Sequence, residues 1–234
     1  MSRKSIFLEG VRDGIPIALG YFAVSFTFGM MAVSGGIHPL DAALISLTNV
    51  TSAGQFAGLK IIFAGGSLLE MAITQLVINL RYFLMSFSLS QRLDREEAWA
   101  HRFIVAFGVT DEIFGVSVSR KGRVSAFYNY GLMSAAIPGW TLGTLCGGIS
   151  GSLLPPFLVS ALSVAIYGMF LAIIIPPAKK NRAVLMVVIL SMAVRCLFEY
   201  APVLSGVSSG FAIILTTLLT AGLGAWFFPV KEER

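Results

Sequence analysis

Long apolar runs, separated by short polar or basic segments, dominate the 234-residue chain. A helix rises about 1.5 Å per residue, so about 20 apolar residues are needed to cross the roughly 30 Å hydrocarbon core of a bilayer. The pattern predicts membrane spans at residues 14–34, 41–64, 68–90, 103–119, 125–147, 157–177, 183–201 and 208–229. We therefore expect an all-α fold, a polytopic transmembrane helical bundle of seven or eight spans in one transmembrane domain covering residues 1–234.

The fourth predicted span, residues 103–119, is short and contains Asp111 and Glu112. It could cross the membrane, re-enter it or lie at the interface. Cytoplasmic loops carry an excess of Lys and Arg, so the basic clusters test these alternatives. If 103–119 crosses, the clusters at residues 3–12, 120–123, 179–182 and 231–234 all fall on one side. We therefore expect a crossing, with an external loop at 92–102 and both termini in the cytoplasm.

Several predicted spans contain helix-breaking features. Pro16 lies in the first, the polar stretch NVTSAGQFAG at residues 49–58 in the second, and Pro138 in the fifth. Interruptions at membrane depth need polar groups of the protein or a water-filled cavity to satisfy the freed backbone, and in transporters they point to binding sites. The matching positions of the two prolines suggest related halves, 1–119 and 120–234, but ordinary proline kinks explain the match equally well.

Composition supports membrane integration and narrows the function. The chain is 56% hydrophobic and only 12% charged, with a mean hydropathy of +0.82, whereas a soluble domain has roughly 25% charged residues. The net charge of +5 arises from short basic clusters between apolar runs, so it indicates membrane topology and a lipid partner and argues against nucleic acid. No phosphate-binding loop, nucleophile–base spacing or metal-ligand cluster appears, so we expect neither an enzyme nor a bound cofactor or metal.

Arg81 lies about midway along the third predicted span. An ionisable residue at this depth costs about 2.5–3.5 kcal/mol on insertion scales, so it is a functional candidate. Its guanidinium can bind a carboxylate with two hydrogen bonds, from a substrate or from an internal Asp. The alternative is a purely structural ion pair inside the bundle.

Asp111 and Glu112 are neighbours in the fourth predicted span. Adjacent side chains on a helix point about 100° apart, so the two carboxylates cannot face one partner. One could pair with Arg81 while the other exchanges protons, because a desolvated carboxylate holds its proton more tightly. The alternative is a surface helix with both carboxylates in water.

Polar side chains also lie on the broken second span and on the seventh. Gln55, with three neighbours at Asn49, Thr51 and Ser52, could bind polar substrate atoms or simply join helices. Arg195 and Glu199 are four residues apart on one helix face, which favours a structural ion pair. Cys146 and Cys196 both lie in apolar runs and are expected to be unpaired.

Three stretches make the sequence familiar: EGVRDGIPIALGYFAVSFTFGM at 9–30, the segment 51–93 with NLRYFLMSFSLSQRL, and GVTDEIFGV at 108–116. They resemble the AzlC family, the large subunits of bacterial branched-chain amino acid exporters. The resemblance is specific over roughly the first half of the chain. The second half is similar mainly in length and hydropathy.

Three family elements carry the resemblance at individual positions. They are read here as Ser52, Ala53, Gly54 and Gln55; as Asn79, Leu80 and Arg81; and as Thr110, Asp111 and Glu112. Tyr82 stands where many members have histidine, so no imidazole can carry protons at that position.

The resemblance implies proton-coupled secondary export of valine, leucine, isoleucine and also methionine across the bacterial cytoplasmic membrane, with a small AzlD-type membrane subunit. Arg81 or the positive end of a half-helix would hold the substrate carboxylate, and Asp111 or Glu112 would meet the ammonium or the proton. The remaining expected substrate contacts are Gln55, Asn79, Ser52, Gly54 and Tyr82, with Phe26 and Phe56 against the aliphatic side chain. A carrier of another small solute or ion, or a scaffold subunit that transports nothing, is the alternative.

Overall fold

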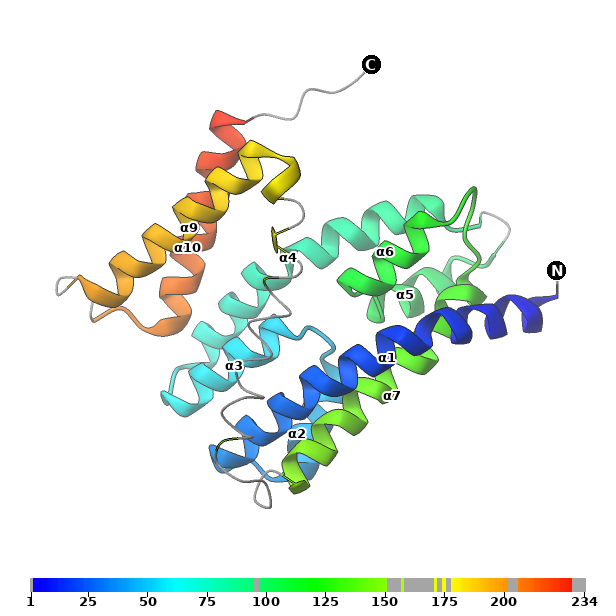
Figure 1. Cartoon of the computed structure of the whole chain (residues 1–234), viewed down its shortest axis with the longest axis horizontal. Helices are drawn as coiled ribbons and strands as arrows, with labels where there is room; N and C mark the ends of the chain where they lie inside the picture. Colours follow the sequence, from blue (N-terminus) through cyan, green and yellow to red (C-terminus); the bar gives the residue numbers. More distant parts are fainter. Residues whose placement is uncertain are drawn as a thin grey trace. The chain divides into compact units, whose positions relative to one another are not determined.

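The computed structural model describes residues 2–94, 97–150, 157, 171, 174–175, 178–201 and 206–228. Its helices are α1 (Arg3–Ser34), α2 (Pro39–Thr48), α3 (Ala53–Phe63), α4 (Leu68–Arg92), α5 (Ala100–Phe107), α6 (Asp111–Ser119), α7 (Ala126–Ser150), α9 (Arg182–Tyr200) and α10 (Ser209–Phe227). Figure 1 shows these helices along the chain. Within the described residues the only β-type pairing is an isolated bridge between Leu93 and Val124. The predicted all-α class is confirmed.

Among the described residues, five helices are long and apolar enough to cross a membrane, namely α1, α4, α7, α9 and α10. The last two agree with the predicted spans 183–201 and 208–229 to within two residues at each end. Large apolar side chains on α4, α9 and α10 are exposed, and α9 has no buried residue, as expected for surfaces that face lipid. The predicted span 157–177 lies almost entirely outside the described residues.

Two of the predicted spans are pairs of short helices. In 41–64, α2 and α3 are separated by residues 49–52, which we call the first break. The expected interruption of this span is confirmed. In 103–119, α5 and α6 are separated by residues 108–110, the second break. The Thr110 hydroxyl accepts a hydrogen bond from the Ile113 N–H (3.3 Å) and thereby caps the start of α6.

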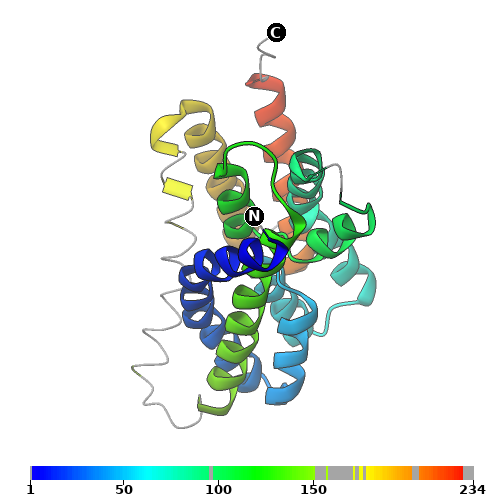
Figure 2. The ribbon, with the colours of Figure 1, turned by 90° about the vertical axis from the view of Figure 1, so that its right-hand side faces the viewer.

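The two prolines, in contrast, do not interrupt their helices. Pro16 lies inside α1 and Pro138 inside α7, so the expected interruptions there are wrong. A proline removes one backbone hydrogen bond, but its φ suits a helix and close packing supports the chain around it. The helices run side by side (Figures 1 and 2), and a Cβ added to Gly139 would lie 2.7 Å from the Ala18 carbonyl oxygen.

Other glycines also bring α1 and α7 into backbone contact. A Cβ on Gly147 would lie 1.9 Å from the Phe26 carbonyl oxygen, and one on Gly29 would lie 2.0 Å from that of Thr144. Small residues at a helix interface permit this approach in membrane proteins. The α1–α7 pair therefore forms a tightly packed frame for the elements beside it.

Contacts divide the chain into two compact units, one of residues 1–55 and 79–163 and the other of residues 56–78 and 164–234. We describe each unit by itself. The division into halves 1–119 and 120–234 stays a prediction.

In the first unit, the segments flanking α5 and α6 lie together. The Asp94 N–H donates to the Val124 carbonyl (3.0 Å), and the Val124 N–H donates to that of Arg92 (2.9 Å). Arg120 pairs with Glu9 near the start of α1. Residues 94–119 therefore begin and end at one end of the unit, beside the start of α1, and the predicted crossing of 103–119 is wrong.

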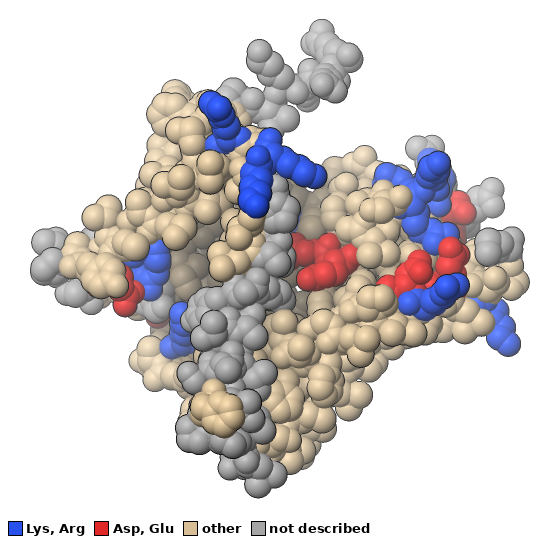
Figure 3. Space-filling model, in the orientation of Figure 1, with Lys and Arg blue, Asp and Glu red and all other residues tan. Residues whose placement is uncertain are grey.

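This arrangement also places more of the basic residues at one end of the unit than the predicted eight-span arrangement does. The same end holds Arg3, Lys4, Arg12, Arg92, Arg102, Arg120, Lys121 and Arg123. Since an excess of Lys and Arg marks cytoplasmic segments, this distribution favours a cytoplasmic side for this end, whereas 92–102 was expected to be an external loop. Figure 3 shows charged side chains of both signs gathered near the start of α1, with further charged groups elsewhere on the same face.

The second unit gives a matching result. Glu70, in the first turn of α4, accepts hydrogen bonds from the Ser208 hydroxyl and from the Gly210 N–H (3.1 Å) at the start of α10. The turn before α4 and the loop before α10 thus share one end, although eight crossings would separate them. In the first unit, residues 94–119 form a re-entrant segment that returns to the end from which it starts.

Candidate functional site

The first unit contains an ion pair between Arg81 of α4 and Asp111 of α6. The guanidinium Nη1 lies 2.9 Å from the Asp111 carboxylate, and Nη2 donates to the Tyr82 hydroxyl (3.1 Å). The guanidinium also lies over the Tyr82 ring, 4.8 Å from its centre. Both charged side chains are partly accessible, 40% and 28% exposed, so a small ligand could reach them.

Glu112 has a different partner, on α1. The Tyr21 hydroxyl donates to its carboxylate at 2.5 Å, and Tyr21 is only 6% exposed. The two adjacent carboxylates therefore point to different helices, as their helical spacing requires. Both lie in the first turn of α6, where the helix dipole favours negative charge.

Gln55, shortly after the first break, is 3% exposed and forms hydrogen bonds through both its amide oxygen and its amide nitrogen. Trp140 Nε1 donates to its Oε1 (2.7 Å), and its Nε2 donates to the Ser46 hydroxyl (2.9 Å). Ser46 in turn shares a hydrogen bond with Thr144 (2.7 Å). Gln55 thus joins α2, α3 and α7 in this structure, which is the helix-joining alternative considered from the sequence.

The first break has its own local order. The Thr51 hydroxyl donates to the Asn49 side-chain oxygen (2.8 Å), and the Gly54 N–H donates to the Thr51 carbonyl (2.8 Å). Ser52 has a φ of +23°, the one non-glycine residue with positive φ among the described residues. Such a conformation is costly and tends to occur at functional sites.

Two aromatic residues connect the breaks. The rings of Tyr21 and Trp140 meet edge to face with their centres 5.2 Å apart. Tyr21 bonds Glu112 at the second break, and Trp140 bonds Gln55 at the first. The polar groups after both breaks are therefore held by adjacent side chains of the α1–α7 frame.

The predicted site residues are thus only partly brought together. Arg81, Asp111 and Tyr82 form one cluster, Asn79 lies two residues before Arg81 in α4, and Gln55 belongs to the buried network beside it. The Phe26 ring lies against that of Phe22, with centres 6.4 Å apart. Phe56 belongs to the second unit.

Four residues of these networks were missed from the sequence: Tyr21, Ser46, Trp140 and Thr144. Serines and threonines are common in membrane helices, so nothing in the sequence distinguished Ser46 and Thr144 from other hydroxyl residues. The buried Tyr and Trp could have been noticed, because a phenol O–H or indole N–H inside an apolar run needs a partner.

The end of the first unit beside the start of α1 has a separate charged cluster. Arg120 binds Glu9 with two hydrogen bonds (2.7 and 3.2 Å) and lies over the Tyr128 ring, while the Tyr128 hydroxyl donates to Asp13 (2.6 Å). The Glu9 carboxylate raises the pKa of Arg120, chiefly by hydrogen bonding. This end is held by charged contacts between α1, α7 and the loop before α7.

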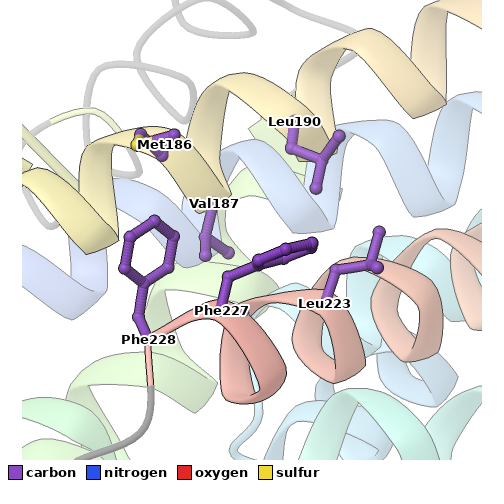
Figure 4. Close-up of a pocket in the computed structure, with 7 residues that line it drawn as sticks. Met186, Val187, Leu190, Leu223, Phe227 and Phe228 are labelled. Atoms are coloured by element: carbon purple, nitrogen blue, oxygen red, sulfur yellow. The ribbon is translucent and has the colours of Figure 1, made fainter.

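The second unit contains an apolar pocket between α9 and α10 (Figure 4). It encloses about 400 Å³ and is lined by Met186, Val187, Leu190, Leu223, Gly224, Phe227 and Phe228. None of these side chains can pair with a charged group, so the pocket does not fit a zwitterion. The ion pair of Arg195 and Glu199 (3.1 Å) is present on α9, as expected.

Neither a metal centre nor a disulfide is found in the described part of the chain. No group of three or more His, Cys, Asp or Glu side chains there could hold a metal ion. Cys146 and Cys196 are free.

Crossing helices, a re-entrant segment and charged groups at membrane depth define a polytopic helical membrane protein. A family model described as AzlC protein matches residues 16–154, more than half of the chain, and the chain belongs to the AzlC family. This confirms the resemblance carried by residues 9–30, 51–93 and 108–116.

The relatives are membrane proteins as well. The chain is 28% identical to the inner membrane protein YgaZ of Escherichia coli over 187 residues, covering 77% of this chain and 76% of the relative. It is 33% identical over 181 residues to an uncharacterized membrane protein of Archaeoglobus fulgidus, covering 76% and 79%. No solved structure matches. The family and these relatives support a role related to membrane transport.

Proposed function

We propose that the protein is a proton-coupled secondary exporter of branched-chain amino acids, namely valine, leucine and isoleucine, with methionine as a further substrate. The observation that carries the proposal is the partly accessible Arg81–Asp111 ion pair at the second break. An amino acid zwitterion offers the same two charges as this pair. Its carboxylate can take the place of Asp111 beside Arg81, and its ammonium can take the place of Arg81 beside Asp111.

The outer edge of the Arg81 guanidinium is suited to such an exchange. Its two donors on this edge are Nη1, which pairs with Asp111, and Nη2, which donates to the Tyr82 hydroxyl. A substrate carboxylate can displace Asp111 from this edge, forming the planar two-point contact that a guanidinium favours. The released Asp111 carboxylate then faces the substrate ammonium, and neither charge is left alone at membrane depth.

Glu112 is the proposed coupling group. It lies next to Asp111 but bonds Tyr21, so it can bind or release a proton without competing for Arg81. A proton taken up from outside would neutralise Glu112 as substrate leaves, and its release to the cytoplasm after the return step would ionise Glu112 again before the next substrate binds. Alternation between two conformations then needs only a change in which ion pairs are formed.

The proposal includes the bacterial inner membrane as location, cytoplasmic termini and a small AzlD-type subunit as partner. The name of the YgaZ relative supports the first, and the basic end of the first unit supports a cytoplasmic N-terminus. The AzlD-type subunit rests on family membership.

Efflux of labelled valine from loaded proteoliposomes, with and without the small subunit, tests the function. In the double variant Arg81→Ala/Asp111→Ala both charges are removed together, so insertion is not penalised by an unpaired ion. We expect efflux to fall by about 100-fold or more, because a close charge contact between protein and substrate can contribute several kcal/mol. The matched control Arg195→Ala/Glu199→Ala also removes a complete Arg–Glu pair, one that lies outside the proposed site, and should transport normally.

The outcomes separate the alternatives. Normal efflux by the double variant, at wild-type amounts in the membrane, removes Arg81 from the mechanism. Flux of another solute without competition by valine would indicate a different substrate, and absence of flux with and without the small subunit would indicate a scaffold.

A further inference from the structure

We infer that the second unit binds an anionic phospholipid at the end of the α9–α10 pair where α9 begins. One acyl chain would lie in the apolar pocket, and the phosphate would lie beside Lys179, Lys180 and Arg182, which we call the α9 cluster. This site shares no residue with the Arg81–Asp111 pair and does not depend on the proposed function.

The apolar pocket supplies the hydrocarbon half of the site. Val187 and Leu190 point from α9 toward α10, and Leu223 points back from α10 (Figure 4). Gly224 brings the two helices close together, since a Cβ on it would lie 2.8 Å from Val187 Cγ2. The volume of about 400 Å³ lies within the usual range of small-molecule pockets, roughly 300–1,000 Å³. The pocket can therefore hold part of a hydrocarbon chain.

The pocket is accessible from the surface of the unit. Met186, Leu223 and Phe227 line it and are exposed, and α9 has no buried residue. Apolar helix faces of a membrane protein that remain accessible meet lipid chains. A lipid can therefore enter the pocket sideways from the bilayer, without any rearrangement of the helices.

The α9 cluster supplies the charge. Its three side chains are exposed, and none of them forms an ion pair with another described residue. Residues 178–194 and 206–228 contain no acidic residue, and residues 229–234 add two acidic and two basic ones. Three neighbouring cations without a counter-charge favour a phosphate, and such basic sites between membrane helices bind anionic headgroups. The excess of Lys and Arg favours the cytoplasmic leaflet for this lipid.

The spacing along α9 fits one lipid to both features. Arg182 and Met186 are four residues apart, so they share one helix face. At a rise of about 1.5 Å per residue, Met186 and Leu190 lie about 6 and about 12 Å from Arg182 along the axis. One leaflet of hydrocarbon is about 15 Å deep. A headgroup at the α9 cluster thus places its chain along the pocket, whereas an apolar partner helix would fill the pocket and leave the cations unpaired.

The test counts lipids bound to the purified full chain by native mass spectrometry, in detergent micelles titrated with phosphatidylglycerol or with phosphatidylcholine of identical chains. We expect one phosphatidylglycerol to bind at least about tenfold more tightly, since each basic side chain adds to the attraction of an anionic lipid. The variant Lys179→Gln/Lys180→Gln/Arg182→Gln should bind both lipids equally.

Matched controls separate charge from pocket. Lys4→Gln/Arg12→Gln/Lys121→Gln also removes two exposed lysines and one exposed arginine, outside the site, and should keep the preference. Leu223→Trp fills the pocket without a change of charge and should weaken binding of phosphatidylglycerol by about fivefold or more. Leu219→Trp makes the same substitution one turn earlier on α10, at an exposed position that does not line the pocket, and should have no effect.

Several outcomes would overturn the inference. They are equal binding of the two lipids by the wild type, a preference that survives loss of the α9 cluster, and equal effects of the two tryptophan variants. Displacement of the lipid by inorganic phosphate would indicate a site for free anions instead. Absence of the lipid once the small subunit is bound would indicate that a protein helix covers the pocket. Valine efflux enters none of these measurements, so the proposed function is tested separately.

Discussion

The two breaks have similar backbone designs but opposite side-chain chemistry. At the first, residues 49–52 lead into α3, whose first turn carries no acidic residue, and Gln55 is buried among neutral hydrogen-bond partners. At the second, residues 108–110 lead into α6, whose first turn carries Asp111 and Glu112, and the ion pair with Arg81 is partly accessible. The first break is thus surrounded by buried, uncharged groups, and the second carries charged groups that are partly exposed.

This difference suggests a division of labour. A neutral buried network loses stability when a partner is removed, but it has no charge to exchange with a ligand. A partly exposed ion pair adds little stability, yet it can trade one carboxylate for another. The first break is therefore expected to control folding and orientation, and the second to control transport.

The proposed transport role of the second break requires that residues 94–119 enter the membrane from the cytoplasmic side and return to it. In a variant lacking Cys146 and Cys196, cysteines at Asp94 and Lys121 should both react with an impermeant maleimide only from the cytoplasmic side. A cysteine at Gly206, in the loop before α10, should react only from outside. Labelling of the first two positions from opposite sides would restore the predicted crossing of 103–119.

The α1–α7 frame that holds both breaks gives the next largest effect. Gly147→Ala places a methyl group where only 1.9 Å separates it from the Phe26 carbonyl oxygen, so the helices must move apart. We expect a loss of about 3 kcal/mol in unfolding free energy, the upper part of the usual cost of overpacking. Gly20→Ala, where nothing lies within 4 Å, should be neutral or stabilising in the same thermal unfolding measurement.

Gln55→Leu tests the neutral break directly. It leaves the buried Trp140 N–H without its acceptor, which should cost about 1–2 kcal/mol of unfolding free energy. Adding Trp140→Phe removes the orphaned donor and should recover part of the loss. A cost that is unchanged in the double variant would show that packing, and not the hydrogen bond, explains the effect.

Ser52→Gly gives the smallest effect. Its φ of +23° is unfavourable for serine and acceptable for glycine, so the change should stabilise the protein by less than about 1 kcal/mol. Ser52→Val should destabilise it, because a β-branched residue tolerates positive φ poorly. Equal melting temperatures for the glycine and valine variants would contradict a strained backbone here.

Sequence patterns gave the helical class and the ends of α9 and α10 because length and hydropathy alone determine them. They also singled out Arg81, Asp111 and the polar first break, since polar groups at membrane depth are costly. The prediction that residues 103–119 cross the membrane was wrong, because counts of charged residues cannot distinguish a crossing segment from a re-entrant one. Whether Pro16 and Pro138 interrupt their helices depends on the packing of α1 against α7, two helices that are far apart in the sequence.

The Arg81–Asp111 pair also has a consequence for biosynthesis. Arg81 leaves the ribosome about 30 residues before Asp111, a delay of roughly two to six seconds at ordinary rates of synthesis. During this interval α4 carries an arginine without its carboxylate and is poorly suited to the lipid interior. We therefore expect α4 to stay beside the insertion machinery until α6 emerges and supplies Asp111.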